Sequence, residues 1–319
     1  MTRPVVLCAA DLAHSPKARE ILENACKVLY TPATPEALQE HLPEADAYLA
    51  SLHVQLTKEL IEKSPRLKAI ATPSTGLDHI DIQATKDRGI AVLGLKDDRE
   101  FLDRITSTAE LAWGLLLACV RRIPEAFASV REGQWGRDRY RGRQLTGKTL
   151  GILGCGRLGT IVSQYGLAFR MNVIGNDVRP VNLPGVRMVS FDELISRSDV
   201  LSIHIHLTPE NRRLIDRDVL KRMKPGAVLI NTSRGAILDE SALLEALQTG
   251  NLTAGLDVIE GEWDEQIGNH PLVEYARTHE NLIITPHVGG VTHEAQEMAY
   301  ARAAEKLVAY FSESAPRGS

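Results

Sequence analysis

Three polar residues in the second half of the chain have side chains suited to acid–base chemistry on an anionic ligand. Arg234 follows the apolar run 227–230, and an α/β sheet places ligands at the carboxyl end of such a buried strand. Its planar guanidinium can bind two carboxylate oxygens at once. His287 supplies an imidazole for proton transfer near neutral pH, and a carboxylate such as Glu262 beside it would favour the charged ring. Taken alone, Arg234 could equally form a surface ion pair, and His287 could be a structural histidine. The pairing of Glu262 with His287 is therefore a hypothesis.

A glycine-rich turn gives a second signal. Gly154, Gly156 and Gly159 form a G-x-G-x-x-G motif between the predicted strand 150–153 and a predicted helix that begins at Arg157. In this context the first glycine permits a tight turn, the second lets the backbone approach a pyrophosphate, and the third lets helix and strand pack closely. The N–H groups at the helix start, including those of Arg157 and Leu158, face the anion. The motif therefore predicts a dinucleotide cofactor.

An acidic residue after the next predicted strand sharpens this prediction. Asp177 lies 177 − 159 = 18 residues after the last glycine of the motif. A carboxylate there can hydrogen-bond both hydroxyls of the adenine ribose and would repel a 2′-phosphate. We therefore expect NAD(H) rather than NADP(H), a preference that the nearby Arg179 weakens. The alternative is that Asp177 only caps a turn.

The elements that must position these residues follow one pattern in both halves of the chain, because apolar runs alternate with helical stretches. In the first half we expect strands at 5–8, 28–30, 47–50, 67–71 and 90–92, and helices around 16–24, 35–41, 57–62 and 82–88. In the second half we expect strands at 150–153, 172–175, 200–205, 227–231, 252–258 and 282–285, and helices from 157 and at 191–196, 239–247 and 294–311. Repeated strand–helix–strand order indicates parallel sheets covered on both faces, hence an α/β fold.

A long predicted helix at 105–127 interrupts the alternation and indicates a crossing between two domains. Pro124 should disturb its last turns. The stretch Arg131–Arg143 that follows is rich in arginine and also contains Trp135 and Tyr140. It is interpreted as a solvated or subunit-contact arm, with an anionic ligand and nucleic acid as the open alternatives.

Composition excludes several classes of protein. The 319 residues are 44% hydrophobic and 24% charged, which is typical of globular domains, and a net charge of −4 does not suggest a dedicated nucleic-acid binder. The four cysteines form no C-x-x-C pair, so neither a metal site nor a disulfide framework is expected. The apolar run 111–120 covers about half of a membrane span, and no export signal is visible. We expect a cytoplasmic protein with no membrane or nucleic-acid partner.

Five blocks together resemble the D-isomer-specific 2-hydroxyacid dehydrogenases. They are 154–159 with Asp177, 199–210, 224–239, 255–262 and 285–290, with a weaker match at 74–81. The resemblance spans nearly the whole chain and implies an NAD-dependent oxidoreductase that acts on a small D-2-hydroxy acid or 2-oxo acid. It also implies two doubly wound parallel-sheet domains, with a Rossmann NAD-binding domain at 105–287 inserted into a flavodoxin-like substrate-binding domain at 1–104 and 288–319. We expect a homodimer.

The resemblance assigns a role to each matched residue. It implies that Arg234 binds the substrate carboxylate and carbonyl, that His287 is the general acid/base, and that Glu262 holds and tunes His287. The other implied contacts are the backbone N–H groups of Thr75 and Gly76 to the substrate carboxylate, Asp257 and Thr232 to the nicotinamide carboxamide, and Thr208 to the cofactor phosphates or ribose.

The chain departs from the family pattern beside the expected site. His206 stands where the family often has Pro, and Trp263 follows Glu262 where Pro is usual, in a segment 263–271 that is longer than usual. These differences leave the substrate open, although the absence of arginine from 50–53 and 71–74 favours a small unphosphorylated acid such as glyoxylate, hydroxypyruvate or glycerate over phosphohydroxypyruvate. An NAD(H)-sensing, corepressor-like protein on the same fold is the alternative function, and phosphite oxidation the alternative reaction.

Overall fold

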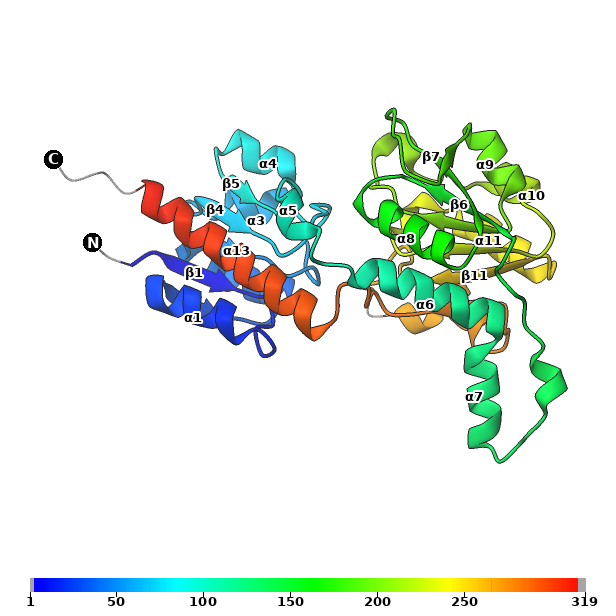
Figure 1. Cartoon of the computed structure of the whole chain (residues 1–319). Helices are drawn as coiled ribbons and strands as arrows, with labels where there is room; N and C mark the ends of the chain where they lie inside the picture. The colour runs from blue at the N-terminus through cyan, green and yellow to red at the C-terminus, as the bar shows by residue number, and fades with distance from the viewer. Residues whose placement is uncertain (1–2, 265, 315–319) are drawn as a thin grey trace. The chain divides into compact units, whose positions relative to one another are not determined.

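The chain forms two compact units, and the computed structural model describes residues 3–264 and 266–314 (Figure 1). The first unit joins Met1–Ile105 to Thr292–Ser319, and the second is Thr106–Val291. The domain boundaries predicted from the sequence lie between residues 104 and 105 and between residues 287 and 288. Every strand pair in both sheets is parallel, which confirms the predicted α/β class with two doubly wound sheets.

The first unit contains a five-stranded sheet in the order β2-β1-β3-β4-β5. Its strands are β1 Val5–Cys8, β2 Lys27–Tyr30, β3 Ala47–Leu49, β4 Ala69–Ala71 and β5 Ala91–Leu93. Its helices are α1 Pro16–Ala25, α2 Pro35–His41, η1 Leu42–Glu44, α3 Lys58–Glu62, α4 Ile82–Asp87, α5 Arg99–Leu102 and α13 His293–Ser314. The closing helix α13 returns to this unit from the far end of the sequence.

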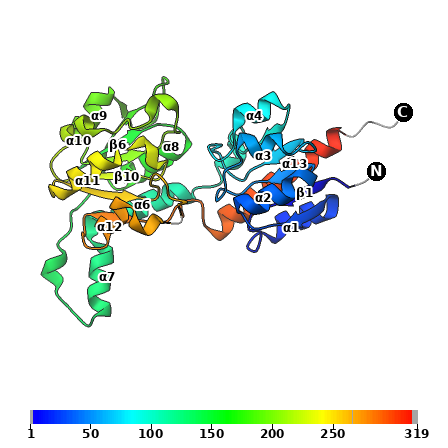
Figure 2. The ribbon, with the colours of Figure 1, turned by 180° about the vertical axis from the view of Figure 1, so that it is seen from behind.

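Alternating side chains along each strand bury both faces of this sheet. Leu7, Tyr48 and Ile70 pack with residues of α2, α3 and α4. Their strand neighbours, such as Val6 and Leu49, pack with α1 and α13 on the other face. Figures 1 and 2 view these two layers of helices from opposite sides. Because both faces are covered, the strands are apolar throughout, which is why the sequence revealed them.

The second unit contains a seven-stranded sheet in the order β12-β11-β10-β9-β6-β7-β8. Its strands are β6 Thr149–Leu153, β7 Asn172–Asn176, β8 Arg187–Met188, β9 Val200–Ile203, β10 Ala227–Asn231, β11 Leu252–Leu256 and β12 Leu282–Ile284. Its helices are α6 Ser107–Arg121, α7 Ile123–Arg131, η2 Arg137–Tyr140, α8 Arg157–Ala168, α9 Phe191–Arg197, η3 Pro209–Asn211, α10 Arg217–Arg222, η4 Gly235–Ile237, α11 Glu240–Gln248, η5 Ile267–Asn269 and α12 Pro271–Ala276. Helices α6 and α8 cover one face and α9 to α12 the other (Figures 1 and 2).

The prediction of one continuous helix at 105–127 is wrong. The structure divides it into α6 and α7 at Arg122, which has a left-handed backbone with φ of 54°. Pro124 lies in the first turn of α7, where its missing N–H costs no helical hydrogen bond. Proline therefore starts a second helix here instead of weakening the end of the first. In Figure 1, α7 and the segment after it project from the rest of the second unit.

The apolar run 111–120 lies in α6, where Ala112, Leu115 and Leu116 pack against the second sheet. This packing accounts for its hydrophobicity. Across the described ranges, no helix is both long and apolar enough to cross a bilayer.

Candidate active site

Arg234 lies three residues after β10, in a turn that a buried asparagine holds. Asn231 ends the strand with no exposed surface, and its side-chain oxygen accepts a hydrogen bond of 3.0 Å from the Ser233 N–H. Its amide nitrogen donates to the Arg234 carbonyl at 2.9 Å, while the Ser233 hydroxyl donates to Ile203 on neighbouring β9 at 2.9 Å. The turn is thus tied to two strands, and Arg234 leaves it from a fixed backbone. One signal in the sequence could have identified Asn231, since it is a polar residue that ends an apolar strand.

His287 follows β12 in a left-handed conformation, with φ of 53°. A residue other than glycine is uncommon there, and such a conformation costs about 1–3 kcal/mol unless its surroundings hold it. Asp257 stabilises this conformation. Its backbone carbonyl accepts a hydrogen bond of 2.9 Å from the His287 N–H. Its carboxylate accepts three more, from Thr285 Oγ1 at 2.6 Å, Val288 N at 2.9 Å and Gly289 N at 2.8 Å. Burial raises the pKa of Asp257, and these three donors oppose that rise. Asp257 therefore fixes the loop that carries His287.

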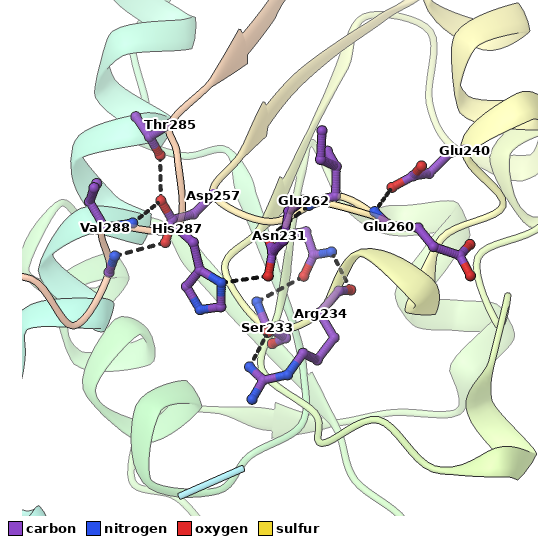
Figure 3. A network of polar contacts seen from close by, with 12 residues as sticks. Asn231, Ser233, Arg234, Glu240, Asp257, Glu260, Glu262, Thr285, His287 and Val288 are labelled. Atoms are coloured by element: carbon purple, nitrogen blue, oxygen red, sulfur yellow. Dashed lines mark hydrogen bonds and ion pairs between the residues drawn. The ribbon is translucent and has the colours of Figure 1, made fainter. Parts of the chain in front are cut away.

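The His287 ring is paired with Glu262, as the sequence suggested. Nδ1 lies 2.6 Å from Glu262 Oε1, and both side chains are mostly buried, with exposed fractions of 20% and 17%. An Nδ1–H that donates to this carboxylate leaves Nε2 for a ligand, and Nε2 has no partner among the described residues. Figure 3 shows His287 and Arg234 near each other in one network of polar contacts, and each follows the carboxyl end of a strand of the second sheet. The structure therefore brings together all three residues that the sequence selected for catalysis.

The glycine-rich turn has the geometry that a dinucleotide requires. Gly154 has φ of 92°, and a side chain there would lie 2.6 Å from the His204 carbonyl oxygen. A side chain at Gly159 would collide with the Gly154 carbonyl, whereas the space beside Gly156 at the start of α8 is open. The N–H groups of Leu158 and Gly159, in the first turn of α8, precede the first helical hydrogen bond, which the Thr160 N–H donates to the Gly156 carbonyl at 2.9 Å. These residues fit the pyrophosphate of NAD at the helix start.

Asp177 lies beside the same turn. Its Oδ2 accepts the Cys155 N–H at 2.9 Å, while its Oδ1 accepts the Arg179 N–H at 2.9 Å and lies 3.3 Å from the Arg179 guanidinium. Partial burial raises the pKa of Asp177, but these hydrogen bonds outweigh it, so the net shift is downward. The carboxylate is therefore ionised near neutral pH, as ribose binding requires.

The remaining cofactor residues differ in how readily they fit their expected roles. Thr232 is buried, and within the described part of the chain its hydroxyl has no hydrogen-bond partner, so it can serve a ligand amide. Thr208 precedes η3, and its N–H donates to Asn211 Oδ1 at 2.8 Å. Both oxygens of Asp257 already accept hydrogen bonds, so a carboxamide would have to share them. The expected cofactor roles of all three remain predictions.

Thr75 and Gly76 lie in the first unit, in the loop after β4. The Gly76 N–H donates to Ser74 Oγ at 3.1 Å, whereas the Thr75 N–H has no partner in residues 3–264 and 266–314. Of the two, the Thr75 N–H is the more available to a carboxylate. Its predicted role in substrate binding stays a prediction.

The second unit has the fold and the phosphate-binding turn of a dinucleotide-binding dehydrogenase domain. Residues 113–289 match the model of the NAD-binding domain of the D-isomer specific 2-hydroxyacid dehydrogenases. The chain belongs to this family, and the predictions of the family and of NAD as cofactor are confirmed.

Several named enzymes are similar in sequence or structure to this chain over most of its length. D-3-phosphoglycerate dehydrogenase of Methanocaldococcus jannaschii is 39% identical over 310 residues, which are 95% of this chain but 57% of that relative. Hydroxypyruvate reductase of Thermotoga maritima is 37% identical over 274 residues, 85% of this chain and 87% of that one. The crystal structure of D-lactate dehydrogenase from Aquifex aeolicus, complexed with NAD and lactic acid, has a TM-score of 0.86 at 31% identity and covers 97% of this chain and 96% of that chain. The chain thus spans little more than half of the phosphoglycerate dehydrogenases that it matches. These relatives are enzymes, which favours the dehydrogenase prediction over the corepressor-like alternative.

Proposed function

We propose that the protein is an NAD-dependent D-2-hydroxyacid dehydrogenase that interconverts a small 2-oxo acid and its D-2-hydroxy acid. The observation that carries this proposal is the His287–Glu262 pair beside Arg234 at the carboxyl ends of the strands of the second sheet, with Nε2 of His287 free to contact a ligand. An acid/base beside an anion-binding guanidinium is the combination that reduction of a 2-oxo acid requires.

The residues of the site have different tasks in the proposed reaction. Arg234 binds the carboxylate of the substrate and polarises the carbonyl oxygen of its 2-oxo group. The Thr75 and Gly76 N–H groups contribute to binding of the carboxylate. The glycine-rich turn and Asp177 would hold NADH, which when bound would supply the hydride that adds to the carbonyl carbon. His287 donates the proton from Nε2 to the carbonyl oxygen, which becomes the hydroxyl of the product, and Glu262 stabilises the charged imidazole through Nδ1. In the oxidative direction His287 accepts that proton.

The test is a turnover assay of the full chain with NADH and a panel of 2-oxo acids. Replacing the acid/base by His287→Gln should lower the rate by about a hundred- to ten-thousand-fold. A wild-type protein that binds NADH but oxidises it with no acid in the panel would refute the proposal and support the sensing alternative.

For the substrate we propose an unphosphorylated acid such as glyoxylate or hydroxypyruvate. The loops 50–53 and 71–74 contain no arginine to bind a phosphate, and the relatives of similar length include enzymes named for these two acids. Including 3-phosphohydroxypyruvate in the panel tests this directly, since a higher kcat/KM for that acid would overturn the choice.

We also propose that the protein is a cytoplasmic homodimer and that the arm formed by α7 and η2 contacts the second copy. Large apolar side chains are exposed there, with exposed fractions of 51%, 62%, 52% and 86% for Ile123, Phe127, Val130 and Trp135. Isolated exposure of this kind is ordinary, but a cluster on one projecting segment is typical of an interface. Sedimentation should give a dimer that Phe127→Glu dissociates and that Tyr30→Glu, an exposed aromatic position in the first unit, leaves intact. A wild-type monomer would contradict the proposal.

The cytoplasmic location rests on the cysteines. All four are free thiols, three of them buried, as a reducing compartment allows. Fractionation of cells that express the chain tests it, and recovery outside the cytoplasm would contradict it.

A further inference from the structure

An aromatic ring covers one face of the proposed acid/base. The rings of Trp263 and His287 are stacked, with their centroids 5.6 Å apart and their planes inclined by 25°. Trp263 directly follows Glu262, at the position where the sequence departs from the usual proline of the family. Two consecutive residues therefore contact the same imidazole, one through its Nδ1 edge and the other across its face.

These contacts restrain different motions of the histidine. The bonds from the His287 loop to Asp257 fix the backbone, and the bond to Glu262 fixes the direction of Nδ1 within the ring plane. Rotation about the Cβ–Cγ bond would tilt the ring out of that plane and turn Nε2 away from its ligand. A stacked indole opposes such a tilt, because the two flat faces would lose contact.

We propose that Trp263 is a positioning residue that holds the imidazole of His287 in its proton-transfer orientation by stacking on its face. The proposal rests on the function proposed above and assigns the departure from proline a role in the same site. Proline has no aromatic face and lacks the cation-binding surface of the indole, so it cannot replace this contact. The carboxylates that also face the ring are Glu262 and Asp257.

The first test compares variants by steady-state kinetics. Trp263→Ala should lower kcat by about tenfold to a hundredfold and change KM for the 2-oxo acid by less than about threefold, because misorientation affects the transition state more than substrate binding. Trp263→Phe keeps a ring on the same face and should recover kcat to within about threefold of wild type. Tyr30→Ala removes an exposed aromatic ring in the first unit, outside the site and the arm, and serves as the control.

The second test needs no turnover. A protonated imidazole in contact with an indole quenches its fluorescence, so the emission of the unliganded wild-type chain should fall as the pH is lowered. This pH-dependent component should disappear in both Trp263→Phe and His287→Gln, and it should persist in Trp135→Phe. Its persistence in Trp263→Phe or in His287→Gln would overturn the ring contact itself.

The two tests separate failure of this inference from failure of the proposed function. If the wild type turns over a 2-oxo acid while Trp263→Ala, checked by circular dichroism to be folded, keeps wild-type kcat, the positioning role is wrong and the dehydrogenase proposal stands. If Trp263→Ala does not fold, Trp263→Leu replaces it, since leucine fills the space without an aromatic face. If the wild type turns over no acid, the dehydrogenase proposal fails, and the positioning role fails with it even where the fluorescence signal appears.

Discussion

Replacing Glu262 by glutamine removes a charge from the site and changes little else. The glutamine oxygen can still accept the hydrogen bond from His287 Nδ1, so the tautomer that presents Nε2 to the substrate is retained. What is lost is the attraction between a carboxylate and the imidazolium that exists when His287 holds the proton. The effect of Glu262→Gln should therefore depend on whether the reaction forms or consumes that imidazolium.

The structure sets the size of this effect. The bond is short, at 2.6 Å, and both side chains are mostly buried, so solvent screens the pair weakly. A hydrogen bond to a charged group contributes about 1.5–3 kcal/mol, which corresponds to about a tenfold to hundredfold change in rate. Oxidation of the hydroxy acid at high pH creates the imidazolium in the transition state and should lose up to this factor, because the glutamine keeps the hydrogen bond and removes only the charge. Reduction at low pH begins with the imidazolium already formed, and a less stabilised imidazolium is also a stronger acid, so its rate should fall by less than about threefold.

The assay measures kcat/KM for oxidation at high pH, where the reaction starts from the neutral ring, and for reduction at low pH, where it starts from the imidazolium, for wild type, Glu262→Gln and the control Glu260→Gln. Glu260 is two residues away and pairs with Arg212 rather than with His287, so its replacement should leave both rates close to wild type. Equal losses in oxidation at high pH and in reduction at low pH would show that Glu262 acts through geometry alone. An unchanged oxidation rate would refute the role assigned to the pair.

Three further changes test other parts of the site and fold. Arg234→Lys loses the planar fork and should lower kcat/KM for the 2-oxo acid by about a hundredfold while leaving NADH affinity, measured by fluorescence titration, within about twofold. Asp177→Ala removes the acid beside the glycine turn, so the ratio of kcat/KM with NADPH to that with NADH should rise by about tenfold or more in coupled assays. Asp199→Asn weakens the bonds from Thr149 N and the Lys224 ammonium to this carboxylate, at 2.7 and 3.1 Å, and should lower Tm at pH 7 by about 2–4 °C. Partial burial raises the pKa of Asp199, but these bonds outweigh it, so the pKa in the folded protein is lowered. The bonds therefore stabilise the fold above the ordinary aspartate pKa. The difference in Tm between wild type and Asp199→Asn should vanish as the pH falls through the lowered pKa of the folded protein.

Most of the fold was predictable from the sequence, because both faces of each sheet are buried. The strand at 5–8 was predicted with the bounds of β1, and buried runs such as 227–231 need no alternation to be recognised. The strand β8, Arg187–Met188, was missed because two residues, one of them charged and exposed, form no apolar run. The break at Arg122 was also missed, since a proline signal cannot say whether a helix ends or restarts.

The site was predictable in its reactive groups but not in what supports them. Arg234, Glu262 and His287 have recognisable chemistry and neighbours in the sequence. The support from Asp257 joins residues about thirty positions apart through hydrogen bonds that no local pattern encodes. The sequence shows tryptophan at position 263 where the family usually has proline. The stacking of Trp263 on His287, however, depends on how two separate loops meet in space.

The order of strands explains how three separate loops make one site. Strands β10, β11 and β12 are adjacent and parallel, and Arg234 follows the first while His287 follows the third. Neighbouring strands lie about 4.8 Å apart, so the outer two end about 10 Å from each other, an interval that a small acid and two side chains can fill. The loop after the middle strand supplies Glu262, and Asp257 at its start ties β11 to the His287 loop. Because the Arg234 turn is held by β10 and β9 instead, a change that shifts β11 against β12 should impair proton transfer before it impairs binding of the substrate carboxylate.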